Sequence, residues 1–253
     1  MLNTYSKWYF GHTIDSSNNI LSFNDGSGDK TATLKLGDYT LTEFVTEIAR
    51  SMNAASSVTF SASVNRSTRL ITISAGSSFE LSTASGSAAN PFGLMGFSGA
   101  DKTGANTYTG STASGSEFKP QMKLKGFIDF NDNQKSAYSS VAKSANGTVE
   151  VVSFGDENMM VCDIIYQTNN NTTGSVIENQ ANGLDNLRTF MQYVTKKRKV
   201  EFIPNRDAPN TFTKCILEST QASGDGTGFR LNEYLGTLPG FFSSGTLTWR
   251  KVL

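Results

Sequence analysis

The spacing of apolar residues along the chain predicts two amphipathic α-helices. The first covers 41–54, where apolar residues recur at intervals of three and four and therefore share one helical face. These residues are Leu41, Phe44, Val45, Ile48 and Met52. Thr40 precedes the helix and Glu43 follows three residues later, which is a capping box: each side chain satisfies a free main-chain N–H of the first turn.

The second helix is predicted over 183–196, with the same spacing of apolar residues. Its core face consists of Leu184, Leu187, Phe190, Met191 and Val194. Asn182 is a residue type that caps helix starts, and the helix ends in the basic cluster 196–199. A short strand at 199–203 follows directly, and Pro204 ends it.

Most of the remaining chain shows the alternation and turn residues of β-strands. Asn, Asp, Ser and Gly separate these segments, and the pattern over 20–36 predicts a β-hairpin. The predicted strands cover 5–14, 20–23, 30–36, 57–64, 68–74, 78–82, 121–130, 147–154, 158–167, 199–203, 211–218, 229–235 and 245–252. The fold class is therefore α+β and β-rich, with antiparallel sheets and one amphipathic helix packed on each of two domains.

The domain boundary is expected near a segment of low apolar content. Residues 98–117 are rich in Gly, Ser and Thr, which predicts a flexible loop or linker. The predicted domains are 1–117 and 118–253. Before this segment, 90–97 predicts one helical turn that closes the end of the first core, with Pro91 at its first position.

Composition and charge argue against several classes of function. Charged residues make up 17% of the 253 residues, and Lys+Arg and Asp+Glu both number 22, so nothing steers the chain toward nucleic acid. The basic cluster 196–199 could be a nuclear-import signal or a nucleic-acid patch, but a solvated helix end explains it better. No window reaches the roughly 20 apolar residues of a membrane span, and the N-terminus lacks a signal peptide's apolar core. We expect a chain made and kept in a cytoplasm until assembly, with no nucleic-acid partner and no membrane insertion.

The residue types that usually carry catalysis are scarce. His12 is the one histidine, which argues against His-based triads and His-rich zinc sites. Cys162 and Cys215 lie in apolar runs without CxxC spacing, so buried free thiols are expected, although a disulfide would form if their strands were neighbours.

Two acidic segments are candidates for a cation site. Residues 25–29 (DGSGD) are followed by a strand and lack the late glutamate of a calcium loop, since that place holds Leu36, so they predict a hairpin turn. Residues 129–133 suggest a second acidic loop, where a weak cation site stays open. No segment singles out two carboxylates for glycoside hydrolysis. We therefore predict no catalytic, cofactor-binding or metal-binding residue, no cofactor, and no enzymatic activity.

The first half of the chain, roughly residues 8–110, contains a series of short motifs. They are 18–26 (NNILSFNDG), 31–34 (TATL), 37–40 (GDYT), Glu47-Ile48, 52–55 (MNAA), 67–69 (STR) and 92–97 (FGLMGF). This series resembles the pattern of tailed-bacteriophage and prophage virion structural proteins. Similar modules occur in tail-tip, baseplate and fibre-attachment proteins, although this chain departs from a full match to the distal tail protein family. The resemblance implies a tail structural subunit that acts in virion assembly and host attachment. Its partners would be copies of itself, in a ring or trimer, and tail tube, hub or fibre proteins.

Other places in a virion stay open. A receptor- or carbohydrate-binding fibre protein would use exposed aromatic rings, and the candidates are Tyr108, Tyr138 and Trp249. A head–tail connector or capsid decoration protein would look similar in sequence. In each case, 98–117 and 168–180 are the segments expected to reach a neighbouring subunit.

Overall fold

The computed structural model describes residues 6–119, 128–136, 140–143, 149–152, 156–164, 184–234 and 238–252. These residues form antiparallel sheets with two α-helices, which confirms the α+β, β-rich fold class. The chain divides into two compact units. The first unit consists of Lys7–Glu117 and Lys199–Phe212, and the second contains Phe118–Arg198 and Thr213–Leu253.

The first unit is built on a five-stranded antiparallel sheet. Its path runs β4-β3-β7-β6, and β8 pairs with β7. The unit also contains two separate antiparallel strand pairs, β2 with β5 and β1 with β14. The elements are β1 (Lys7–Phe10), β2 (His12–Ile14), β3 (Ile20–Asn24), β4 (Asp29–Thr33), β5 (Gly37–Tyr39), α1 (Leu41–Ala55), β6 (Phe60–Asn65), β7 (Leu70–Leu81), β8 (Lys102–Thr109) and β14 (Val200–Ile203).

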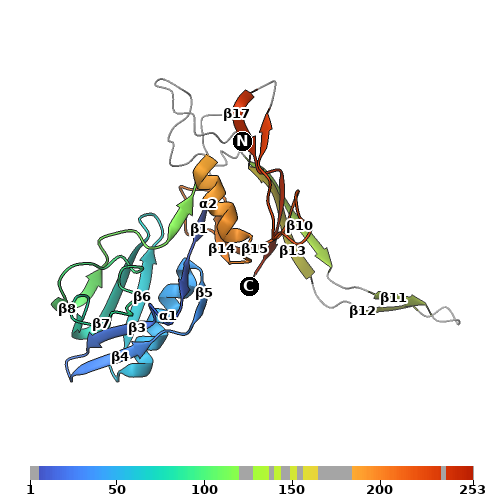
Figure 1. The fold of residues 1–253 in the computed structure, drawn as a ribbon. Helices are drawn as coiled ribbons and strands as arrows, with labels where there is room; N and C mark the ends of the chain where they lie inside the picture. Colours follow the sequence, from blue (N-terminus) through green and yellow to red (C-terminus); the bar gives the residue numbers. More distant parts are fainter. Residues whose placement is uncertain are drawn as a thin grey trace. The chain divides into compact units, whose positions relative to one another are not determined.

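Helix α1 forms as its apolar spacing predicts and packs against the sheet (Figure 1). Thr40 caps it, and both hydrogen bonds of the capping box with Glu43 are present. The core between helix and sheet is aromatic: the ring of Phe60 meets Phe23 and Phe79 edge-on at 5.2 and 5.1 Å. Such edge-to-face pairs add stability beyond the area they bury.

The turn at 91–97 closes one end of this core. Phe92, Met95 and Phe97 are buried in it. The N–H of Met95 donates to the carbonyl oxygen of Pro91, which gives the single helical turn that the sequence predicts.

The prediction of a linker over 98–117 is wrong. Strand β8 lies in the middle of this segment and pairs antiparallel with β7, and β9 (Ser116–Phe118) lies at the end of the segment. The segment is polar because β8 is a sheet edge with one solvated face. On that face Thr109 and Thr72 bring their hydroxyl oxygens within 2.9 Å, while Tyr108 points to the core and meets Phe79.

The second unit contains an antiparallel sheet whose described strands follow the order β10-β13-β18-β15. Strand β13 has neighbours on both sides, as the apolar run at 158–167 predicts. The elements are β10 (Ile128–Ser136), β11 (Ser140–Lys143), β12 (Val149–Val152), β13 (Asp156–Ile164), α2 (Leu184–Val194), β15 (Thr213–Thr220), β16 (Asn232–Tyr234), β17 (Leu238–Ser243) and β18 (Thr246–Lys251).

Helix α2 supplies the aromatic centre of the second core. Leu187, Phe190, Met191 and Val194 are fully buried, which confirms four members of the predicted apolar face. The ring of Phe190 stacks on another aromatic ring, that of Phe118, at 4.7 Å. Asn182 and the side chain of Leu184 lie outside the described residues.

The chain returns to the first unit after α2. Lys199–Phe212 belongs there, because β14 pairs antiparallel with β1 at the opposite end of the sequence. The predicted range 118–253 for a second domain therefore includes a segment that the structure groups with the first. Among the described residues, no helix is long and apolar enough to cross a membrane.

Candidate functional site

The basic cluster 196–199 lies at the end of α2, and its geometry begins with Lys197. The backbone of Lys197 has a φ of 60°, and its N–H donates to the carbonyl oxygen of Val194, which ends the helix. Its ammonium nitrogen donates to three main-chain oxygens, those of Leu217 at 2.8 Å, Glu218 at 3.1 Å and Asp225. Lys197 therefore ties the helix end to β15 and the loop that follows it.

Two other cations of the cluster also have partners. The guanidinium of Arg198 lies 5.2 Å from the ring centre of Tyr193. The ammonium of Lys199 lies 2.7 Å from a carboxylate oxygen of Glu43, the same residue that closes the capping box. The cluster lies at a helix end as expected. Lys197 and Lys199 are not simply solvated, because their ammonium groups bind main-chain oxygens and Glu43.

A buried ion pair fixes the returning segment within the first unit. Arg66 Nη2 lies 2.7 Å from Glu201 Oε2, and the two side chains are 8% and 0% exposed. Arg66 Nε donates to the carbonyl oxygen of Pro209 at 2.6 Å, and its Nη1 donates to the hydroxyl of Thr42 at 3.0 Å. Glu201 accepts the main-chain N–H of Thr42 at 2.9 Å. These contacts join the helix start, β14 and the segment at Pro209, so the arrangement has a structural role.

Tyr9 completes this network on β1. Its hydroxyl donates to the carbonyl oxygen of Arg66, and burial raises the pKa of Tyr9 to about 12. Lys7 lies 4.7 Å from the centre of the ring, while Arg66 and Arg69 lie 5.4 and 5.7 Å away. The cation–π contacts hold the ring in place. Burial, followed by the charge of Glu117, raises the pKa of Tyr9 and keeps the phenol neutral, although Arg69 and Arg66 act in the opposite direction.

His12 lies in β2 and is buried, so it does not face solvent. Its Nε2 is 2.8 Å from the hydroxyl oxygen of Ser114, and its ring centre is 4.7 Å from that of Phe44. Burial lowers the pKa of His12 to about 4. The imidazole is therefore neutral at physiological pH and packs as part of the core.

Both cysteines are free and buried, as the sequence predicts. Cys162 lies in β13 and Cys215 in β15, and β18 separates the two strands in the sheet, so no disulfide joins them. The indole N–H of Trp249 donates to Cys162 Sγ at 3.2 Å. Burial raises the pKa of the Cys162 thiol to about 12, which argues against a nucleophilic role.

The acidic turn 25–29 is the hairpin turn between β3 and β4, as predicted. Asp25 accepts hydrogen bonds from the N–H and hydroxyl of Ser27 and from the hydroxyl of Ser56. The bonds from Ser27, followed by that from Ser56, lower the pKa of Asp25 to about 2. The carboxylate thus ties the turn to the end of α1 and is not available for a cation.

The acidic loop predicted at 129–133 is part of a strand. Asp129, Asp132 and Asn133 lie within β10, paired with β13. Within the part of the chain that the structure describes, no three His, Cys, Asp or Glu residues gather as a metal site.

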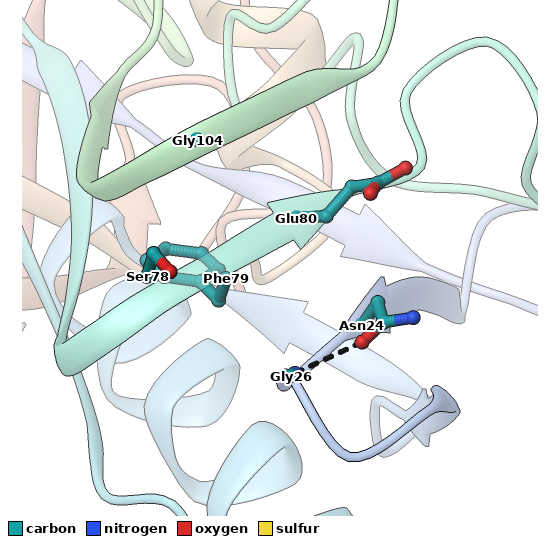
Figure 2. Close-up of a pocket in the computed structure, with 6 residues that line it drawn as sticks. All are labelled: Asn24, Gly26, Ser78, Phe79, Glu80 and Gly104. Carbon is teal, nitrogen blue, oxygen red and sulfur yellow. Dashed lines mark hydrogen bonds between the residues drawn. The ribbon is translucent and has the colours of Figure 1, made fainter.

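The first unit has a pocket of about 220 Å³ beside the β3–β4 turn (Figure 2). Its lining consists of Asn24, Gly26, Ser78, Phe79, Glu80 and Gly104. The side chain of Asn24 accepts the N–H of Gly26 at 2.9 Å, and Figure 2 shows the carboxylate of Glu80 extending away from that turn. The described lining offers the carboxylate of Glu80 and the hydroxyl of Ser78, without a histidine or lysine to act as a base, which gives no catalytic constellation.

A second pocket of about 400 Å³ lies in the second unit. Its lining consists of Gln221, Ala222, Arg230 and Asn232, and the amides of Gln221 and Asn232 bind each other at 2.9 Å. Arg230 is the one charged group among the described lining residues. These residues do not include the paired titratable groups that acid–base chemistry needs.

The aromatic rings considered for sugar binding are mostly engaged elsewhere. Trp249 is fully buried, so the expectation that it is exposed is wrong. Tyr108 is partly buried, and its hydroxyl donates to the carbonyl oxygen of Phe79 and accepts the N–H of Ala105. Tyr138 and the segment 168–180 lie outside the described residues.

The chain was compared with protein-family models and with curated protein sequences. No family model matches it, and no curated protein is significantly similar to it in sequence. The residues and their geometry are therefore the basis for proposing a function.

Proposed function

We propose that this chain is a structural subunit of a tailed-bacteriophage virion, placed at the tail tip or baseplate. It acts in virion assembly and host attachment as a homo-oligomer, a ring or trimer. Its other partners are tail proteins such as the tube, the hub or a fibre. The chain is made in the bacterial host cytoplasm and then becomes part of the tail.

The observation that supports this proposal is the core of the first unit. The motifs that carry the resemblance supply residues of this core: Leu21 lies in 18–26, Leu34 in 31–34, Ile48 in α1 and Phe92 in 92–97. These four residues share one buried cluster, so motifs that lie apart in the chain are parts of one folded module.

The internal contacts favour a rigid assembly part over an enzyme. The buried pair of Arg66 and Glu201 and the carbonyl contacts of Lys197 use charged groups to fix the backbone. The thiol of Cys162 and the imidazole of His12 are buried and neutral. The two pockets bring no acid–base pair together. The fibre-type alternative loses support because Trp249 is buried.

Mass spectrometry of purified virions tests this proposal. Particles are released from a host that carries this gene and purified by density gradient, and the peptides of heads and of separated tails are quantified. We expect the chain in the tail fraction, at a copy number that is a small multiple of three. Its presence in the head fraction would favour the connector or decoration alternative. Its absence from all particles would refute the proposal.

A further inference from the structure

We propose that β8 is an assembly edge, at which two copies of this chain pair their β8 strands antiparallel about a two-fold axis centred on Tyr108. The inference rests on the proposed homo-oligomeric role. It names the contact that joins a copy in one ring or trimer to a copy in a second one, since a two-fold contact does not repeat around a single ring. In this pairing Thr107 of each copy lies opposite Thr109 of the other, and the five-stranded sheet continues from one subunit into the next.

Strand β8 has an open hydrogen-bonding edge. Among the strands that the structure describes, β8 pairs with β7 alone, and Figure 1 shows it at the margin of the first unit's sheet. The N–H of Gly110 donates to the carbonyl oxygen of Ile71, so the main-chain groups of Gly110 face β7. Since this direction alternates along a strand, those of Thr109 and Thr107 point outward. Two residues with outward groups, placed opposite each other, exchange two hydrogen bonds.

Strand β8 has no charged residue where it would meet the β8 strand of a second copy. Exposed edges are usually protected by lysine, proline or inward charges. From Thr103 to Thr109 this strand has none of these, and its one lysine, Lys102, stands at the far end. A two-fold axis at Tyr108 keeps the two copies of Lys102 well beyond the paired residues, so no like charges face each other.

Serine and threonine hydroxyl groups form rows across the outer face of the sheet. Ser61 and Ser74 bring their hydroxyl oxygens within 2.8 Å, and Thr72 and Thr109 within 2.9 Å. Ser74 is in turn the register partner of Thr107. Each row of hydroxyl residues ends at β8. Pairing Thr107 with Thr109 of a second copy joins the rows of both copies, and cross-strand pairs of threonines stabilise sheets.

Strand β4, another edge of the sheet, is a poorer candidate for such a contact. Strand β4 includes Asp29 and Lys30, and Arg50 reaches the carbonyl oxygen of Thr33 at 3.4 Å. These charged groups lie along the edge that a neighbouring strand would need. A β8–β8 contact avoids β4 altogether and is self-complementary, as two-fold interfaces require.

Register-specific disulfide cross-linking tests the inference. The variants Thr107→Cys and Thr109→Cys of the full chain are prepared separately, under conditions where light scattering shows oligomers, then mixed and oxidised. Because hydrogen-bonded pairs place their Cα atoms about 5.5 Å apart, within disulfide range, we expect a covalent dimer in the mixture. Each variant alone should give little, since equal residues are not opposite each other. The native cysteines are buried and do not compete. A mixture of Thr107→Cys with Ser63→Cys, an exposed position on β6, is the control.

A charge-swap pair gives a second measurement that does not depend on oxidation. Thr107→Lys/Thr109→Lys places like charges opposite each other twice, whereas Thr107→Lys/Thr109→Glu places opposite charges there. We expect the Lys/Lys variant to dissociate at a concentration roughly tenfold higher than the Lys/Glu variant. Equal dissociation of the two variants, or no cross-link in the mixture while the chain stays oligomeric, overturns the β8 contact and leaves the proposed function standing. A chain that is monomeric at every concentration overturns both.

Discussion

The buried pair of Arg66 and Glu201 allows the sharpest prediction about stability. Arg66→Met removes the cation and leaves the carboxylate of Glu201, which is 0% exposed, with the main-chain N–H of Thr42 as its remaining hydrogen bond. It also leaves the carbonyl oxygen of Pro209 without its donor at 2.6 Å. Breaking a buried ion pair by removing one partner costs roughly 3–5 kcal/mol. We expect a loss of this size in the free energy of unfolding of the first unit.

The double variant separates the ion pair from its surroundings. Arg66→Met/Glu201→Leu removes both charges, so it should cost less than the sum of the two single variants, with a coupling energy of roughly 2–3 kcal/mol. Arg250 and Glu218 provide the matched control. They also lie 2.8 Å apart, but their side chains are 41% and 37% exposed. Removing Arg250 should cost roughly 0–1 kcal/mol.

Urea unfolding followed by tryptophan fluorescence measures these effects. The chain has two tryptophans, and Trp8 lies in β1, with its ring centre 5.0 Å from that of Phe202, the residue after Glu201. A Trp249→Phe background therefore reports on the first unit. A Trp8→Phe background reports on the second unit, in which the control pair Arg250 and Glu218 lies. Single variants that lose less than about 1 kcal/mol, like the exposed pair, would refute the reasoning. A double variant whose cost equals the sum of the single costs would do the same.

Three further predictions concern the second unit's basic cluster, the buried histidine and the buried thiol. Lys197→Met should lower stability by roughly 1–3 kcal/mol in urea unfolding, because three carbonyl oxygens lose a charged donor, while Lys196→Met should change it by less than about 0.5 kcal/mol. For His12, whose pKa falls from 6.5 to about 4, the folded state binds the proton more weakly than the unfolded state. Stability is therefore full above pH 6.5 and declines as the pH falls toward 4, and His12→Gln should flatten that decline in unfolding midpoints. Cys162, with its pKa of about 12, should not react with a thiol reagent until urea unfolds the chain; rapid labelling of the native protein would contradict its burial.

The features that the sequence predicted well are local ones. Helix α1 and its capping box depend on residues within one stretch, and Phe44 and Ile48 mark the buried face by spacing alone. The same holds for Phe190 and Met191 in α2. Local periodicity is sufficient where an element buries one clear stripe.

The features that it missed depend on partners far away in the chain. Strand β8 reads as a linker because a solvated edge needs few apolar residues, and Tyr108 is its main contact with the core. The return of 199–212 to the first unit depends on the pairing of β14 with β1. Neither Lys199 nor Glu201 carries a local sign that its partner is Glu43 or Arg66.

The most direct test of the central claim is the assembly state of the purified chain. Size-exclusion chromatography with light scattering, over a wide range of concentrations, gives the mass, and electron microscopy of the same fractions gives the symmetry. A structural subunit of a tail tip should form a discrete oligomer with three-fold or higher rotational symmetry. A single species at the 27.3 kDa of one chain, at every concentration, would contradict the account.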